Sequence, residues 1–191
     1  MNLQYILASG SPMRQQILKQ LGIQFDTIPS NITETPEEGE APEKLASRLG
    51  KEKCETIASR HPGAVVIGGD QLLTLDNTIL GKPKTLENAQ KQLALFSNNW
   101  VTSIANVSVT YQGTTLQKNA ICRIKFKELS EKMINSYLLD PLCLECAGSL
   151  RVESNGILLI ESVESDDPFS IYGMPLIATA ELLEHHGLIS L

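Results

Sequence analysis

The chain has 191 residues, 42% of them hydrophobic, and its formal net charge is −6 at pH 7. This length and apolar content predict one globular domain over residues 1–191. The negative charge argues against an extended DNA- or RNA-binding surface, because such surfaces concentrate lysine and arginine. No apolar run approaches the roughly 18 to 20 residues of a membrane helix, and the N-terminus lacks a signal-peptide pattern, so we expect a cytoplasmic protein that is not bound to a membrane.

The N-terminal segment predicts a strand, a tight turn and a helix. Tyr5 to Ala8 is a short apolar run, which indicates a buried strand. Ser11 is a suitable helix N-cap, and Pro12 suits the first helical position. The helix should end at Gly22, because glycine commonly follows the last turn.

An exposed loop and a long amphipathic helix follow. Residues 31–42 contain proline, glycine and several glutamates without apolar periodicity, which predicts the loop. From Glu43 to His61, apolar residues recur in steps of four and define one face of a helix. Lys53 falls on that apolar face, and Gly50 is expected to be a mild weakness within the helix.

The middle of the chain predicts strands separated by turns. Residues 64–70 form a second apolar run that ends in Asp70. Asp76-Asn77 then suits the turn of a short hairpin, and Thr85 to Phe96 has the pattern of a helix.

The remaining segments complete an α/β pattern. Residues 101–109 and 114–126 predict a strand pair hinged at Gln112-Gly113. After it we expect a helix from Ser130 through Leu139, a strand from Ile157 to Val163, an acidic turn over 164–168 and a terminal helix from about Pro175 to Glu184. Because the hairpin adds antiparallel pairing, the predicted fold is one extended mixed sheet flanked by helices.

The turn from Ser9 to Arg14 is a candidate anion-binding site. Small residues between a strand and a helix leave backbone N–H groups exposed at the positive end of the helix. The Arg14 guanidinium can add bidentate contacts to a phosphate group. The same pattern is equally typical of an ordinary capped helix, so the sequence leaves both interpretations open.

Three other charged residues each have a functional and a structural interpretation, and for Asp70, where we favour function, the structural alternative is capping of a turn. Asp70 follows a buried strand, where an ionised carboxylate is costly unless it faces solvent, a partner or a metal ion. Lys53, taken alone, is better explained by a long stem that reaches water, and Lys82 between glycine and proline would also suit a plain surface loop. Together with Glu34 and Arg14, however, these residues make up a set suited to a triphosphate and a hard metal ion.

Short motifs in both halves of the chain occur in a characteristic order. They are LASGSPMR at 7–14, ETP at 34–36, IGGDQ at 67–71 and GKP at 81–83, followed by segments at 146–149, 153, 156–157, 167–168 and 173–176. With these motifs the chain resembles the Maf-type nucleotide pyrophosphatases, and its C-terminal segments are similar to the 7-methyl-GTP pyrophosphatase subgroup. The resemblance covers almost the whole chain and implies a Maf or ITPase-like fold. It also implies a hydrolase that cuts a modified nucleoside triphosphate to the monophosphate and pyrophosphate.

The resemblance also implies roles for particular residues. Asp70 would be the general base that activates water, and Glu34 with Asp70 would bind a divalent cation such as Mg, Mn or Co. The implied phosphate-binding residues are Ser9, Ser11, Arg14, Lys53 and Lys82, and the implied specificity positions are Met13, Gln71 and Glu153. The partner would be a small-molecule nucleotide, and a homodimer is compatible with the sequence, which does not fix the oligomeric state.

The specificity positions match the subgroup in two places out of three. Gln71 and Glu153 agree with it, and a carboxylate at Glu153 can accept hydrogen bonds from the N1 and N2 edge of guanine. Methylation at N7 makes that base cationic, which a carboxylate also favours. Met13 stands where the subgroup has a tryptophan, and its thioether makes a softer contact with an aromatic ring. Ser165 is a second departure, because the family usually has glycine there.

Two groups of residues are expected to be structural. Cys143 and Cys146 have the spacing of a metal or redox motif, but no second pair or suitably spaced histidine completes a tetrahedral site. The chain is also large enough to need no disulfide. His61, His185 and His186 lie at or near predicted helix ends, where capping is the simpler explanation.

Two other functions remain open at this point. A nucleotide-binding regulator of septum formation would bind nucleotide without turnover, although the presence of Glu34 and Asp70 argues against it. A pyrophosphatase for dTTP, UTP or deaminated purines is the third hypothesis. Gln71 with Glu153 argues against the dTTP and UTP branch.

Overall fold

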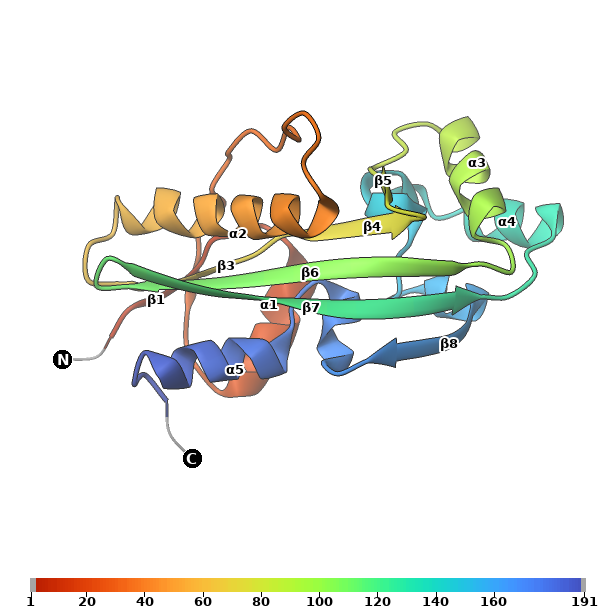
Figure 1. Cartoon of the computed structure of the whole chain (residues 1–191). Helices are drawn as coiled ribbons and strands as arrows, with labels where there is room; N and C mark the ends of the chain where they lie inside the picture. The colour runs from red at the N-terminus through yellow and green to blue at the C-terminus, as the bar shows by residue number, and fades with distance from the viewer. Residues whose placement is uncertain (1–2, 190–191) are drawn as a thin grey trace.

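A long antiparallel hairpin runs through the whole molecule (Figure 1). Its strands are β6 (Trp100–Tyr111) and β7 (Thr114–Phe126), which pair from one end to the other. The two residues of the turn, Gln112 and Gly113, both have positive φ angles, 49° and 78°, as tight hairpins require. The computed structural model describes residues 3–189 and confirms this predicted hinge.

The other strands extend the hairpin into a mixed sheet. Within residues 3–189 the sheet has eight strands, and β2, β1 and β3 are mutually parallel while all other pairings are antiparallel. These strands are β1 (Tyr5–Leu7), β2 (Asp26–Thr27), β3 (Val65–Gly68), β4 (Gln71–Leu75), β5 (Thr78–Leu80) and β8 (Ile160–Ser165). The predicted fold class, a mixed sheet flanked by helices, is therefore confirmed.

Helices cover the sheet on both faces. The helix α2 lies on one face of the hairpin, α1 and α5 lie on the other, and α3 with α4 packs at the end far from the chain termini (Figure 1). Apolar clusters fill the spaces between these layers, and at the far end the rings of Phe96 and Phe126 are 4.9 Å apart. The helices are α1 (Pro12–Leu18), α2 (Pro42–Ala58), α3 (Leu86–Phe96), α4 (Glu131–Tyr137) and α5 (Leu176–His185). No helix between residues 3 and 189 has the length and apolarity needed to cross a membrane.

Local signals place most element boundaries correctly. The hydroxyls of Ser11, Thr85 and Ser130 cap α1, α3 and α4 by accepting backbone N–H groups, as their positions before each helix indicate. The strand predicted from Ile157 is wrong at its start, because β8 begins only at Ile160. Gly156 donates its N–H to the Arg151 carbonyl at 3.0 Å, so the backbone there forms a turn that cannot pair with β7.

A break between β3 and β4 positions the candidate carboxylate. Both strands pair with the same edge of β6, and only Gly69 and Asp70 separate them. Asn106 of β6 donates its N–H to the Asp70 carbonyl at 2.8 Å, which holds the break against the sheet. A Cβ atom at Gly69 would lie 2.1 Å from the Asn106 carbonyl oxygen, so only glycine allows this approach. The close approach at Gly69 therefore fixes the backbone that carries the Asp70 side chain.

A second close approach brings α2 onto the same part of β6. A Cβ atom at Gly50 would lie 1.9 Å from the Asn106 Oδ1 atom, and Gly50 is buried in the contact. Asn106 cannot move freely, because its side chain is bonded to Ser108 and Asn119. Gly50 is thus required by packing, which helix propensity does not reveal.

We therefore expect the Gly50→Ala variant to be less stable than the wild type. Alanine favours the helix by about 1 kcal/mol, but overpacking typically costs about 1 to 3 kcal/mol, so the steric cost should win. Urea unfolding measures the difference, with Lys44→Ala on the exposed side of α2 as a control that should change little. A stabilised Gly50→Ala variant would contradict the close contact.

Candidate functional site

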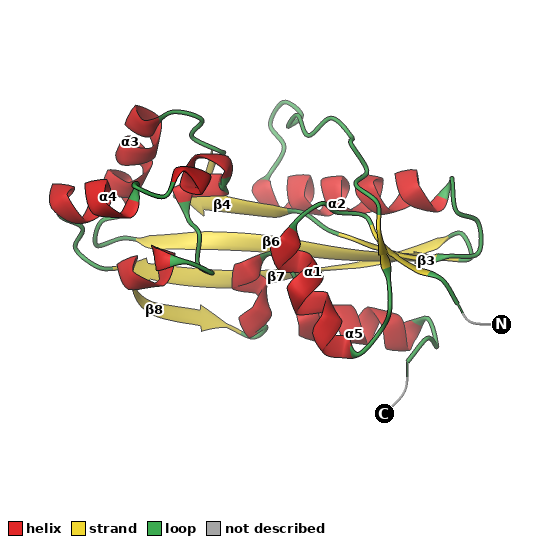
Figure 2. Cartoon of the chain, turned by 180° about the vertical axis from the view of Figure 1, so that it is seen from behind, coloured by secondary structure: helices red, strands yellow, loops and turns green. Residues whose placement is uncertain are grey.

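One cavity collects the residues that the sequence singles out. It has a volume of about 670 Å³, within the range of pockets that bind small molecules. Residues of α1 line it. This helix crosses the sheet between α5 and the end of the molecule that holds α3 and α4 (Figure 2). All of the predicted site residues line this cavity: Ser9, Ser11, Met13, Arg14, Glu34, Lys53, Asp70, Gln71, Lys82 and Glu153. Segments far apart in the sequence therefore meet at a single site.

The turn before α1 is only partly available to an anion. The Ser9 hydroxyl accepts the Ser11 N–H at 3.2 Å, and the Ser11 hydroxyl accepts the Arg14 N–H at 3.4 Å. Two backbone donors of this turn are therefore already bonded within the chain. A phosphate group would meet the two hydroxyls and the remaining backbone N–H groups. The turn therefore offers fewer free N–H donors than the sequence predicts.

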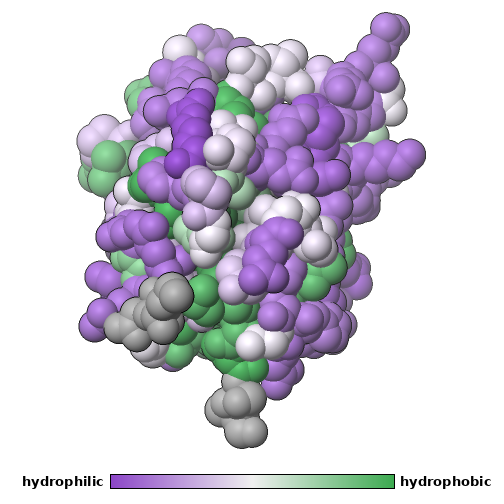
Figure 3. Space-filling model, turned by 90° about the vertical axis from the view of Figure 1, so that its left-hand side faces the viewer, coloured by the Kyte–Doolittle hydropathy of each residue, from purple (hydrophilic) through white to green (hydrophobic). Residues whose placement is uncertain are grey.

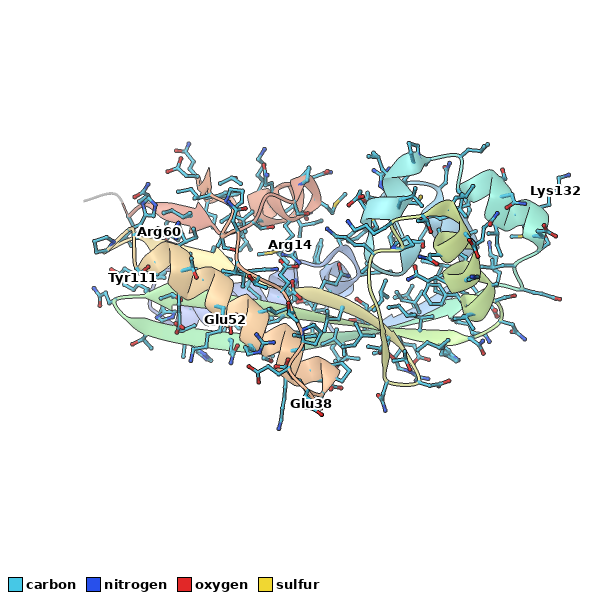
Figure 4. The ribbon with its side chains drawn as sticks, turned by 90° about the horizontal axis from the view of Figure 1, so that it is seen from above. Arg14, Glu38, Glu52, Arg60, Tyr111 and Lys132 are labelled. Atoms are coloured by element: carbon cyan, nitrogen blue, oxygen red, sulfur yellow. The ribbon has the colours of Figure 1, made fainter. Side chains whose placement is uncertain are left out.

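Arg14 is tied to the backbone on two sides of the cavity. Its Nε atom donates to the Gly173 carbonyl at 2.8 Å, and its Nη1 atom donates to the Gly69 carbonyl at 2.7 Å. Burial lowers the pKa of the guanidinium, while the charges of Asp70 and Glu34 oppose that effect. Seen from above, Arg14 lies near the middle of the molecule, well inside the ends marked by Tyr111 and Lys132 (Figure 4). These two bonds use two of the five N–H donors of the guanidinium, so Nη2 and the second hydrogen of Nη1 remain for the predicted phosphate contact.

Lys53 lies between the two acidic residues of the site. Its Nζ atom is 2.6 Å from Asp70 Oδ1 and 2.6 Å from Glu34 Oε1. Lys53 is only 7% exposed and Asp70 only 6% exposed. The interpretation that the lysine stem carries its charge to water is therefore wrong, because the ammonium group ends in a buried ion pair. Pairing of this kind is what makes a buried carboxylate tolerable.

Lys82 lies on the exposed wall of the same cavity. The preceding residue, Gly81, accepts hydrogen bonds at its carbonyl from the Gly148 N–H at 3.2 Å and from the Gln92 side chain at 3.0 Å. The short segment before Pro83 is therefore held in place. Within residues 3–189, Lys82 takes part in no ion pair, so its charge is directed to the cavity and solvent.

The three predicted specificity positions line the cavity. The Gln71 amide nitrogen donates to the Ser103 hydroxyl at 2.9 Å and to the Ile171 carbonyl at 3.1 Å, which leaves its oxygen as the group able to accept from a ligand. Met13 is half-buried and packs against the apolar cluster beneath α1. The Glu153 side chain keeps 28% of its surface exposed and accepts a hydrogen bond from Arg151 Nε at 3.4 Å.

Sequence reasoning missed some charged and polar residues of the wall. Arg151, Glu145 and Tyr172 also line the cavity. Arg151 stands two positions before Glu153, and this proximity to a predicted site residue was the available signal. Ser165, the departure from the family pattern, lies outside the cavity lining and uses its hydroxyl to tie the turn after β8, donating to the Ile121 carbonyl at 2.9 Å.

The two cysteines of the Cys-x-x-Cys segment have thiols with raised pKa values. Cys146 lines the cavity and Cys143 is buried, and both are free. Burial raises the pKa of the Cys146 thiol to about 11, and the charge of Glu153 adds to this effect. Burial raises the pKa of Cys143 as well. A neutral thiol is a poor metal ligand and a poor nucleophile, because the thiolate is the form that binds metals and reacts.

We expect Cys146 to be alkylated slowly by iodoacetamide at neutral pH. At pH 8 a thiol with a pKa near 11 is ionised to only about one part in a thousand. The labelling rate, followed by mass spectrometry of the Cys146 peptide, should therefore rise about tenfold per pH unit between pH 7.5 and 9.5. Labelling of Cys146 in the folded protein at pH 8 as fast as in a short peptide would contradict the raised pKa.

The histidines lie outside this cavity. His185 is the last residue of α5, and the His186 ring contacts the Val109 carbonyl of β6 at 3.2 Å, so His186 bonds to a strand as well as ending the helix. A second hollow of about 510 Å³ lies there, lined by Glu184, His185, Gly187, Leu188 and Ile189. None of the predicted site residues lines it. The surface near the termini has apolar atoms beside hydrophilic flanks (Figure 3).

The cavity brings three cationic side chains together with the Lys53–Asp70 pair, and sequence comparison assigns the chain to a family. The family described as Maf-like protein matches residues 4–186, so the chain belongs to that family. A 7-methyl-GTP pyrophosphatase of Xanthomonas oryzae pv. oryzae (strain MAFF 311018) is 42% identical over 182 residues, covering 95% of this chain and 96% of that protein. A 7-methyl-GTP pyrophosphatase of Bordetella pertussis is 40% identical, covering 96% and 92%. The crystal structure of protein VC0702 from Vibrio cholerae aligns with a TM-score of 0.44 at 13% identity, covering 99% and 100%.

Proposed function

We propose that the protein hydrolyses 7-methyl-GTP to the nucleoside monophosphate and pyrophosphate in the cavity described above. The observation that carries this proposal is the convergence of the ten predicted site residues, from segments far apart in the sequence, on one cavity that also holds the buried Lys53–Asp70 pair. The relatives of similar length that carry this activity in their names support the same conclusion.

Asp70 is the proposed general base. A base must lie where its carboxylate can accept a proton from water beside the reacting phosphorus. The break at Gly69 directs Asp70 into the cavity, and Lys53 fixes one of its oxygens at 2.6 Å. The second oxygen can then accept a proton from the attacking water, and the α-phosphorus–oxygen bond to pyrophosphate breaks as the new bond forms.

Three cations are proposed to hold the triphosphate. Lys53 and Arg14 lie at the buried end and Lys82 at the exposed wall. Their charges stabilise the negative charge that grows on the leaving pyrophosphate, and their fixed positions keep it in line with the attacking water. The hydroxyls of Ser9 and Ser11 would add hydrogen bonds to the phosphate oxygens.

We propose that Glu34 and Asp70 bind a divalent cation together with the phosphate groups of the substrate. Within the described part of the chain, no cluster of three or more His, Cys, Asp or Glu side chains is placed to hold a metal ion. Glu34 and Asp70, however, both approach the single ammonium group of Lys53, and carboxylate oxygens suit Mg or Mn. Such an ion would be held by Glu34, Asp70 and phosphate oxygens, and it would neutralise phosphate charge.

The guanine base of the nucleotide is proposed to lie against the part of the cavity wall that contains Glu153. The carboxylate accepts from N1–H and N2–H of guanine, which adenine does not offer in that pattern. The free oxygen of Gln71 and the soft side chain of Met13 complete the contacts. Thymine and uracil offer Glu153 only one donor, N3–H, where guanine offers both N1–H and N2–H, which argues against dTTP and UTP.

A substrate panel tests this function. The wild-type protein is incubated with Mg²⁺ or Mn²⁺ and, separately, 7-methyl-GTP, GTP, ITP, dTTP and UTP, and the release of pyrophosphate is measured. We expect the highest kcat/KM with 7-methyl-GTP. A higher kcat/KM with UTP or dTTP would move the chain to another substrate class, and tight binding without any turnover would favour the regulatory alternative.

A further inference from the structure

The side chain of Arg151 lies in the cavity wall between two carboxylates. Its Nε atom donates to Glu153 Oε1 at 3.4 Å, and its Nη1 atom pairs with Asp140 Oδ2. The side chains of Arg151 and Asp140 keep only 20% and 24% of their surface exposed. Arg151 therefore links the predicted base-reading carboxylate to a second acid that does not line the cavity.

The backbone around this link is also held. The Arg151 N–H donates to the Tyr137 hydroxyl at 2.9 Å, and that hydroxyl donates to the Ser149 carbonyl at 2.7 Å. Asp140 uses its other oxygen, Oδ1, to accept the Leu142 N–H at 3.0 Å. The backbone N–H of Arg151 and its guanidinium group are thus both bonded to other parts of the fold. The position from which Nε donates to Glu153 is therefore fixed as well.

The net charge of these three linked residues is opposite to the charge of the proposed phosphate-binding residues. Asp140, Arg151 and Glu153 together carry one net negative charge, whereas Arg14, Lys53 and Lys82 gather positive charge elsewhere in the cavity. A purine methylated at N7 is cationic and an unmethylated guanine is neutral. A negative group therefore attracts the methylated base more strongly.

We propose that Arg151 and Asp140 are positioning residues, which orient Glu153 toward the base and set the charge that favours a cationic purine. This inference rests on the proposed function, because it assumes that Glu153 faces the base. Arg151 orients the carboxylate through Nε. Asp140 balances Arg151, so that the arginine does not neutralise the charge of Glu153.

The two residues should differ in their effect on selectivity. Asp140→Asn keeps an oxygen that can cap Leu142 but removes one negative charge, so the ratio of kcat/KM for 7-methyl-GTP over GTP should fall about tenfold, mainly through KM. Arg151→Gln removes the donor to Glu153 and makes the group more negative. It should raise KM for both nucleotides about tenfold without lowering that ratio, and Arg151→Lys should keep the wild-type ratio.

The control is Arg123→Gln, which removes an exposed ion pair with Glu164 outside the cavity. It should leave KM and the ratio unchanged, and melting temperatures identify any variant that fails to fold. A purely structural role for the Asp140–Arg151 pair would lower activity toward both nucleotides in parallel with stability. That result, or an unchanged ratio in a folded Asp140→Asn variant, would overturn the inference.

Equilibrium binding separates this inference from the proposed function. The affinities for 7-methyl-GMP and GMP, measured by calorimetry on the same variants, give the selectivity without turnover. If the wild type binds 7-methyl-GMP selectively, Asp140→Asn lowers that selectivity and no nucleotide is hydrolysed, the inference holds and the proposed function fails. If the wild type hydrolyses 7-methyl-GTP but binding selectivity is the same in all variants, the proposed function holds and the inference fails.

Discussion

Asp70→Asn is expected to lower kcat for 7-methyl-GTP by about 10³. Removal of a general base typically costs about 10² to 10⁴ in rate, and asparagine cannot accept the proton of the attacking water. The amide is close in shape to the carboxylate, so the backbone hydrogen bond between Asn106 and the residue 70 carbonyl should persist. KM should change much less than kcat, because the cations that hold the phosphates remain in place.

The assay is pyrophosphate release at saturating substrate and metal ion. Asp76→Asn is the matched control, because Asp76 lies in the exposed turn between β4 and β5 with φ = 48°, a backbone conformation that asparagine accepts. Its kcat should equal that of the wild type. An Asp70→Asn protein with more than about a tenth of the wild-type kcat would remove Asp70 from the role of base.

Lys53→Met is expected to cost both stability and activity. It removes the ammonium group that lies 2.6 Å from both Asp70 and Glu34, and Asp70 is buried. Breaking a buried ion pair by deleting one partner costs about 3 to 5 kcal/mol. For a chain of this length, a loss of 3 kcal/mol lowers the melting temperature by about 6 to 12 °C.

We expect divalent ions to stabilise the Lys53→Met variant more than they stabilise the wild type. Without the ammonium group, Glu34 and Asp70 are left to share a cation, so Mn²⁺ should raise the melting temperature of Lys53→Met by more than that of the wild type. Lys51→Met, on the exposed side of the same helix, removes a surface pair with Glu55 and should change the melting temperature little. An unchanged melting temperature and kcat in Lys53→Met would show that the pair has no role.

Local sequence signals were enough to predict the start of the first helix and the turn of the long hairpin. Ser11 and Pro12 predict the start of α1, and Gln112-Gly113 predicts the hinge of the long hairpin, because caps and tight turns depend on the chemistry of a few neighbouring residues. The chemistry of Glu34 and Asp70, two carboxylates suited to a hard metal ion, was enough to predict that they share one site. The structure then places both at the same cavity.

Contacts between distant segments could not be predicted in the same way. The bonds of Arg14 to the carbonyls of Gly69 and Gly173 join residues 55 and 159 positions apart, and no local pattern signals them. The need for Gly50 depends on Asn106 of a different element. The link from Asp140 to Arg151 could not be predicted either, because two short 3-10 helices, Pro141–Glu145 and Ala147–Ser149, separate the two residues and their side chains share no periodicity.

Isotope tracing during turnover tests the central claim most directly. The wild-type protein is incubated with 7-methyl-GTP and Mg²⁺ in water enriched in oxygen-18, and the products are analysed by phosphorus NMR. If water attacks the α-phosphorus and pyrophosphate leaves, the label enters only the monophosphate. Label in pyrophosphate, or products other than monophosphate and pyrophosphate, would contradict this account of the cavity.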